Sequence, residues 1–145
     1  MPAPALSSEL LHATTVAIGE RAVVIEGRAG TGKSDLALRL IDRGAVLVAD
    51  DQTLLVREGD RLLARCPPTI RGRMEVRGLG IVAVPYVEDV AIALLVRLGN
   101  EDQRMPERRA RRIAGVAVRE MTLDPFRASA PVKVEWALDL PEVPA

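Results

Sequence analysis

The sequence is poor in the residues that build disulfide-linked, zinc-binding or aromatic-rich proteins. Its 145 residues include one cysteine, Cys66, one histidine, His12, and one each of tryptophan, tyrosine and phenylalanine. A single cysteine excludes an internal disulfide, and one cysteine with one histidine is too few for a structural zinc site. These absences favour a reducing compartment and a buried, chemically inert Cys66.

An excess of charge of either sign is also missing, because 20 basic residues balance 20 acidic ones. No overall field therefore draws the protein to nucleic acid or to an anionic membrane. No apolar run approaches the ~20 residues of a membrane-spanning helix. Residues 1–11 lack the basic start and the long apolar stretch of a signal peptide. We expect a cytoplasmic protein with no nucleic-acid or membrane partner.

The apolar residues that are present are mainly Val, Leu, Ile and Ala, within a hydrophobic fraction of 48%. Such residues suit buried strands covered by helices, which predicts an α/β fold. The length fits one domain over residues 1–145, with residues 1–7 and 139–145 expected to be frayed tails.

Short apolar runs between turn residues predict most of the strands. The predicted strands are 14–18, 22–25, 45–49, 53–56, 61–64, 81–84 and 90–98, with 116–121 and 132–138 as later candidates. Apolar residues at helical spacing over 34–42, followed by Gly44, predict a helix. The charged segment 100–112 is expected to be exposed and partly helical after Pro106.

A phosphate-binding motif stands between the strand 22–25 and the helix 34–42. Residues Gly27–Ser34 read G-R-A-G-T-G-K-S, which matches G-x-x-x-x-G-K-[ST] at every position. The glycines allow backbone N–H groups to converge on phosphate oxygens. Lys33 is expected to reach the β and γ phosphates, and the hydroxyl of Ser34 to ligate Mg²⁺. The cofactor-binding prediction therefore covers Gly27, Arg28, Ala29, Gly30, Thr31, Gly32, Lys33 and Ser34, with ATP and Mg²⁺ as ligands.

Two adjacent carboxylates, Asp50 and Asp51, follow the predicted strand 45–49. A site at the carboxyl edge of a parallel sheet could use one to orient Mg²⁺ and the other to accept a proton from a hydroxyl nucleophile. A turn capped by aspartate is the alternative interpretation of this pair.

Taken together, the motifs resemble the HPr kinase/phosphorylase family, bacterial enzymes that phosphorylate a serine of the phosphocarrier protein HPr. Besides the loop Gly27–Ser34, the matching strings are Arg43-Gly44 with Val48–Asp51, and Glu75–Ile81, which reads E-V-R-G-L-G-I and is close to the family signature. His12 matches a histidine that the family carries near the phosphate site. The resemblance implies a P-loop domain with a mixed β-sheet flanked by helices, similar to the HPr kinase/phosphoenolpyruvate carboxykinase-like fold.

The resemblance also implies a role for each matching residue. Asp51 would accept the proton of the target serine, Lys33 would bind ATP phosphates, and His12 would lie near the transferred phosphate. Asp50 would hold metal-bound water, while Ser34 and Glu75 would bind Mg²⁺. Arg104, in the string Gln103–Pro106, would stabilise charge in the transition state. Without the resemblance, His12 and Arg104 would be interpreted as surface residues.

One string departs from the family pattern. Residues Pro131–Trp136 resemble the P-V-K-x-G-R string tied to the reverse, phosphate-consuming reaction, but Glu135 and Trp136 replace glycine and arginine. The resemblance is to the catalytic domain alone, and it implies HPr as partner and a homo-oligomer, a hexamer in the family.

The leading hypothesis is therefore an ATP- and Mg²⁺-dependent serine kinase acting on HPr or an HPr-like carrier, with weak or absent reverse phosphorylase activity. The alternatives are a non-catalytic ATP sensor and a small-molecule kinase on the same P-loop scaffold.

Overall fold

Strands make up most of the regular structure in the computed structural model, which describes residues 7–101 and 103–141. The strands of this part of the chain are β1 Ser8–Leu11, β2 Ala13–Ile18, β3 Arg21–Glu26, β4 Val46–Ala49, β5 Thr53–Glu58, β6 Arg61–Arg65, β7 Arg73–Val76, β8 Gly80–Ala83, β9 Val90–Leu98, β10 Arg109–Ile113 and β11 Val116–Leu123. The α-helices are α1 Lys33–Asp42 and α2 Ala130–Asp139, and a short 3₁₀ turn covers Pro68–Ile70.

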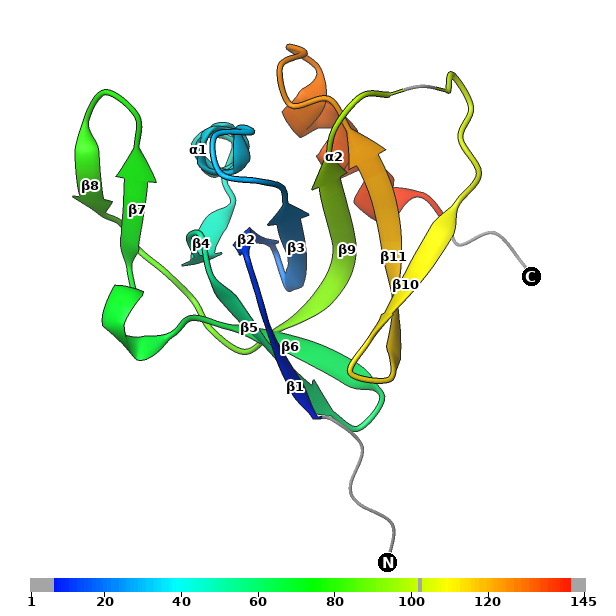
Figure 1. Cartoon of the computed structure of the whole chain (residues 1–145), viewed down its shortest axis with the longest axis horizontal. Helices are drawn as coiled ribbons and strands as arrows, with labels where there is room; N and C mark the ends of the chain where they lie inside the picture. Colours follow the sequence, from blue (N-terminus) through cyan, green and yellow to red (C-terminus); the bar gives the residue numbers. More distant parts are fainter. Residues whose placement is uncertain (1–6, 102, 142–145) are drawn as a thin grey trace, which may run out of the picture.

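The central sheet is mixed, as predicted. β2 lies antiparallel between β3 and β4, β3 pairs parallel with β9, and β9 pairs parallel with β11. The hairpin β10–β11 extends this edge. The carboxyl ends of the parallel strands β3, β9 and β11 therefore meet at one edge of the sheet (Figure 1).

β9 also joins the central sheet to a second group of strands. Its first residues pair with β6, through Ala91 opposite Leu63, while its later residues pair with β3 and β11. β6 continues antiparallel to β5, and β5 to β1. The strands β1, β5 and β6 lie beneath the central strands in the view of Figure 1.

Alternation along the central strands sends side chains to both faces. Val23 and Ile25 of β3 pack toward the helices, while Val24 packs against Leu55 and Leu62 of the hairpin β5–β6. All of these side chains are buried. Because both faces of these strands are covered, the runs 22–25 and 90–96 are continuously apolar.

The two helices lie on the same face of the central sheet (Figure 1). α1 buries Leu36 and Leu40, and α2 buries Val134 and Ala137. The hairpin β7–β8 packs beside α1 and adds Met74, which is 1% exposed, to this core. The hairpin thereby comes close to the beginning of α1.

Cys66 is a free, buried thiol. Burial raises the pKa of this thiol to about 11, so at neutral pH it is protonated and a poor nucleophile. The structure thus agrees with the structural role expected from the sequence.

Two segments differ in type from the sequence-based prediction, and β1 and β7 lie outside the predicted strands. Residues 132–138 were predicted as a strand but belong to α2, because Ala130, Val134 and Ala137 recur at helical spacing and are buried. The segment after Pro106 was predicted to be partly helical, but it leads into β10. β10 forms because Ala114 and Gly115, both at positive φ, make a tight turn that pairs Ile113 with Val116.

Both predicted tails lie largely outside the described residues. Of the described part, Ser7 accepts a backbone hydrogen bond from Arg57, and Asp139 ends α2, where Arg21 donates to its carboxylate. Neither described helix has the length and apolar character required to cross a bilayer.

Candidate active site

The loop between β3 and α1 occupies the carboxyl edge of the central sheet. Gly30 and Gly32 have φ angles of 80° and 103°, a region closed to most side chains. A Cβ on Gly27 would lie 2.5 Å from Oγ1 of Thr31. The three glycines of the motif are therefore required by backbone geometry and by the tight folding of the loop onto itself.

Lys33 begins α1 with its side chain folded back into this loop. The residue is 6% exposed, and Nζ donates to the carbonyl oxygens of Gly27 at 2.8 Å and Arg28 at 3.1 Å. An ammonium group has three N–H donors, so these bonds leave one for an anion. The geometry suits a loop that presents positive charge and backbone N–H groups to phosphate.

Asp50 receives hydrogen bonds from three other segments of the chain. Its Oδ1 accepts from Ser34 Oγ at 2.7 Å and from Thr14 Oγ1 at 2.9 Å, and its Oδ2 accepts from the backbone N–H of Glu75 at 2.8 Å. The residue is 7% exposed. A buried carboxylate of this kind is held in one orientation by its donors.

Asp51 and His12 stand side by side where the chain passes between the two groups of strands. His12 lies between β1 and β2, and Asp51 lies between β4 and β5. His12 Nδ1 and Asp51 Oδ1 are 3.8 Å apart, and the two side chains are 74% and 63% exposed. Asp51 has a φ of 68°, and its N–H donates to Thr14 Oγ1. The exposed carboxylate is thus accessible to a large substrate.

Glu75 and Arg104 are placed less directly. Glu75 lies on β7 with an exposed side chain, and its backbone N–H donates a hydrogen bond to the Asp50 carboxylate. Arg104 is exposed in the segment between β9 and β10, and among the described residues no hydrogen bond or ion pair joins it to the loop. That segment leaves the sheet at the same edge as the loop, because β9 and β3 run parallel.

The sequence analysis missed Thr14, which is fully buried and holds both aspartates. A threonine in a strand gives no sequence signal for such a role.

An ion-pair network directly before the loop was also not predicted. Arg111 donates to both carboxylate oxygens of Glu26, at 2.8 and 3.0 Å, and its Nε donates to Glu120. The hydrogen bond from Arg111 lowers the pKa of Glu26 against the opposing effect of burial.

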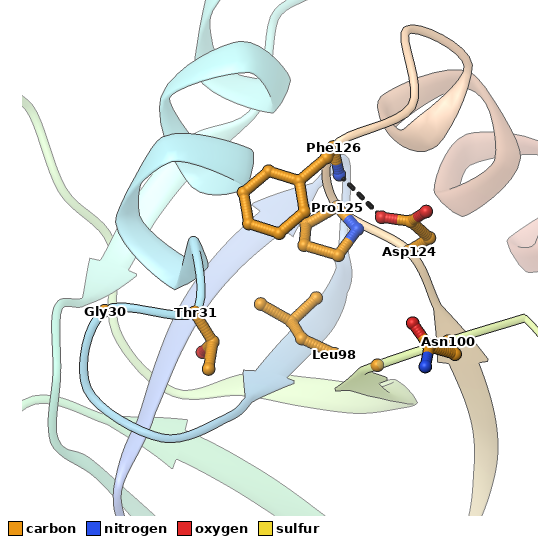
Figure 2. A pocket seen from close by; sticks show the side chains of 8 residues that line it. Gly30, Thr31, Leu98, Asn100, Asp124, Pro125 and Phe126 are labelled. Atoms are coloured by element: carbon orange, nitrogen blue, oxygen red, sulfur yellow. Dashed lines mark hydrogen bonds between the residues drawn. The ribbon is translucent and has the colours of Figure 1, made fainter.

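Two hollows border the loop between β3 and α1 on the side of β9. One, of about 240 Å³, is lined by loop residues, by the end of β9 and by the segment after β11: Gly30, Thr31, Leu98, Gly99, Asn100, Asp124, Pro125 and Phe126 (Figure 2). The other, of about 320 Å³, is lined by Glu26, Gly27, Arg28, Thr31, Arg97 and Leu98. The loop is therefore open to a ligand along this side.

The residues around Ser34 fit a divalent cation that is brought with phosphate. The described residues contain no group of three or more His, Cys, Asp or Glu side chains suited to a metal. Mg²⁺ usually takes one or two protein oxygens and fills its other positions with phosphate oxygens and water. The Ser34 hydroxyl and the Asp50 carboxylate, 2.7 Å apart beside the loop, supply such a pair.

Comparison with known proteins gives consistent matches. The model of the HPr serine kinase C-terminal domain family matches residues 5–129. The HPr kinase/phosphorylase of Chromobacterium violaceum is 49% identical over 78 residues, which are 53% of this chain and 24% of that protein. The HPr kinase/phosphorylase of Burkholderia lata is 35% identical over an alignment of 126 residues that covers 78% of this chain and 39% of that protein. The chain thus spans between a quarter and two fifths of these relatives.

The fold also matches a solved structure. The Hpr(Ser) kinase/phosphatase from Coxiella burnetii aligns with a TM-score of 0.78 and 29% sequence identity. The alignment covers 90% of this chain and 94% of that chain. The mixed sheet with flanking helices predicted from the sequence is therefore the fold of that chain as well.

Proposed function

The chain belongs to the HPr serine kinase C-terminal domain family, and from this premise we propose that it transfers the γ-phosphoryl group of ATP to a serine of HPr or an HPr-like carrier, with Mg²⁺ bound. The observation that carries the proposal is the hydrogen bond between Ser34 and Asp50 beside the exposed Asp51. It joins the proposed phosphate-binding loop to Asp50, the residue directly before the exposed Asp51.

In this proposal Lys33 and the N–H groups of the loop bind the ATP phosphates. Ser34 and Asp50 hold Mg²⁺, which would neutralise charge on the phosphate oxygens. The Glu75 N–H and Thr14 hydroxyl fix the orientation of Asp50. Glu75 would extend this set only if its exposed side chain turned toward the loop, so its proposed role is secondary to that of Ser34 and Asp50.

Asp51 would accept the proton of the acceptor serine as the serine oxygen attacks the γ phosphorus. One P–O bond forms to serine, the P–O bond to ADP breaks, and the electron pair of that bond stays on ADP. His12, 3.8 Å from Asp51, would lie at the transferred phosphate. Arg104 is proposed to add positive charge when its loop is closed over ATP.

The reverse reaction is proposed to be weak or absent. In α2, Lys133 of the altered string binds Glu101 at 2.6 Å, and Glu135 pairs with Arg43 at 2.7 Å. Both charged residues of this string are thus engaged within the chain. Dephosphorylation of a phosphoserine carrier by inorganic phosphate measures this direction.

The test of the forward reaction is the variant Asp51→Asn. Asparagine tolerates a positive φ, so the backbone at 51 is retained. We expect phosphoserine formation on the carrier, followed with radiolabelled ATP, to fall by about 100-fold or more, the usual contribution of a general base. ATP affinity, measured by calorimetry, should stay within about twofold, since Asp51 is not a proposed phosphate ligand.

Asp89→Asn is the matched control, because Asp89 is also an exposed aspartate with a positive φ, of 60°. Asp89 precedes β9, so it lies at the end of this strand away from the loop. Its transfer rate should equal that of the wild type. Transfer that survives in Asp51→Asn would exclude Asp51 as the base. ATP binding by the wild type without transfer to the carrier would favour the sensor alternative.

A further inference from the structure

The hollow of about 240 Å³ shares Gly30 and Thr31 with the loop, and its other lining residues have no role in the phosphoryl transfer proposed above. Its walls combine apolar groups from Leu98, Pro125 and Phe126 with the polar side chains of Asn100 and Asp124 (Figure 2). Pockets that enclose a whole drug-sized ligand measure roughly 300–1,000 Å³. This hollow suits one part of a larger ligand whose remainder lies on the loop.

Phe126 is the most unusual side chain of these walls. It is 81% exposed, although it is one of only three aromatic residues in the sequence. Its Cε1 atom would lie 3.9 Å from a Cβ placed on Gly32, so the ring stands over the junction of loop and helix. Single exposed apolar side chains are common on protein surfaces, so it is the position of Phe126 in the wall of a hollow beside the loop that points to a ligand contact.

The wall that carries Phe126 is held firmly. The Asp124 carboxylate accepts the Phe126 N–H at 3.0 Å, as drawn in Figure 2. Glu101 accepts the Asp124 N–H at 2.8 Å and also binds Lys133 of α2. Burial opposes the ionised form of Glu101, but the Lys133 and Asp124 hydrogen bonds outweigh it and lower its pKa. The segments after β9 and β11 are thus fixed to each other and to α2 around the hollow.

The direction of a bound nucleotide follows from the two sides of the loop. His12 precedes β2 and Asp51 follows β4, and these two residues form the proposed acceptor side. The hollow lies instead beside β9 and β11. The γ phosphate must face the acceptor side. The other end of the nucleotide then points toward the hollow.

We propose that this hollow binds the base of the nucleotide, with the Phe126 ring stacked on the base and Asn100 available to hydrogen-bond its edge. The inference rests on the proposed ATP binding and names the part of the chain that recognises the nucleoside. Every base has an aromatic face, and stacking on a protein ring contributes about 1–3 kcal/mol.

The experiment compares ATP with tripolyphosphate, which has the phosphates but no base. Affinities of both ligands with Mg²⁺ are measured by calorimetry for the wild type, Phe126→Ala, Phe126→Trp and Trp136→Ala. Phe126→Ala should bind ATP roughly five- to 150-fold more weakly, the loss expected for one stacking contact. The affinity of Phe126→Ala for tripolyphosphate should be unchanged. Phe126→Trp keeps an aromatic ring and should bind ATP about as tightly as the wild type.

Trp136→Ala is the matched control, because Trp136 is also an exposed aromatic residue, at 71%, but lies on α2 and does not line the hollow. It should leave both affinities unchanged. Equal loss of ATP and tripolyphosphate in Phe126→Ala, or no loss of either, overturns the assignment of the base while leaving the proposed function standing. A wild type that binds neither ligand overturns the proposed function itself.

Discussion

At the scale of single residues, Asp50 connects β2, α1, β4 and β7 through its two carboxylate oxygens. Removing one donor leaves this buried carboxylate with one hydrogen bond fewer, which destabilises the fold. The same Thr14 hydroxyl that donates to Asp50 accepts the N–H of Asp51. Thr14 therefore couples the position of one carboxylate to that of the other.

This coupling makes Thr14→Val informative. Valine keeps the branched shape of threonine but loses both hydrogen bonds. We expect the free energy of unfolding in urea to fall by about 1–3 kcal/mol. The rate of phosphoryl transfer should fall by roughly 10- to 100-fold, because small displacements of catalytic groups slow a reaction by such factors.

Thr15→Val is the control for this prediction. Thr15 is equally buried, and its hydroxyl bonds to Thr53 instead of to the aspartates. It should lose similar stability without the loss of transfer rate. Equal transfer rates in the two variants would show that Thr14 serves stability alone.

From the fixed spacing of the motif, the sequence predicted a loop between a strand and a helix, and the structure has this loop between β3 and α1, with Gly30 and Gly32 at positive φ. It also predicted that Asp50 and Asp51 lie beside the loop. It did not predict Thr14, or that Glu75 would reach Asp50 through its backbone. Those contacts depend on how β2 and β7 pack against β4 and α1, and no local pattern encodes such packing.

At the scale of elements, the end of β3 is anchored across β9 to the hairpin β10–β11, just before the loop begins. Arg111 of β10 forms two hydrogen bonds with Glu26 and is also bound to Glu120 of β11. Both partners raise the pKa of Arg111. The anchor fixes the point from which the chain enters Gly27.

The variant Glu26→Gln tests this anchor through pH. The pKa of Glu26 is lowered on folding, so its contribution to stability is complete above the unfolded value of 4.5 and is lost as the pH falls through the lower folded value. At pH 7 we expect a loss of roughly 1–2 kcal/mol in the free energy of unfolding. The difference from wild type should shrink below pH 4.5. Denaturant titrations at pH 7, 5 and 3 measure it.

Glu20→Gln, in the exposed turn between β2 and β3, is the control and should follow the wild type at every pH. A difference between Glu26→Gln and wild type that is constant from pH 7 to pH 3 would contradict a role for the ionised carboxylate.

The errors in the predicted elements have physical causes. Residues 132–138 alternate apolar and polar side chains, which resembles a strand, yet buried residues at positions 130, 134 and 137 give the helical period that packing selects. β10 is rich in arginine and has a weak strand signal. It is held by its partner β11 and by the turn at Ala114 and Gly115, so only tertiary pairing reveals it.

At the scale of the whole molecule, β9 is the strand that joins the central sheet to the strands β1, β5 and β6. It pairs with β3, β6 and β11, and Leu95, at its middle, is fully buried. Ala22 is opposite Ile92, so the pairing of β3 with β9 closes a long stretch of chain. The centre of the sheet can thus open only when the long-range structure is lost.

Hydrogen exchange followed by mass spectrometry tests this dependence. Peptides covering 22–26 and 92–96 should be the most protected, and their protection should approach the free energy of global unfolding. Peptides covering the edge strands at 8–11 and 109–113 should exchange faster by a factor of about ten or more. Protection of 8–11 equal to that of 22–26 would contradict this order.

The placement of His12 has a consequence for assemblies of the chain. β1 is a four-residue strand at one edge of the described sheet, held by its pairing with β5, and His12 follows it directly. Exchange of an identical element between two copies of a protein is a low-cost route to dimers. Two copies that exchanged β1 would exchange the adjoining histidine with it. Each aspartate pair would then face an imidazole from the other copy, and the unit of activity would be a pair of chains.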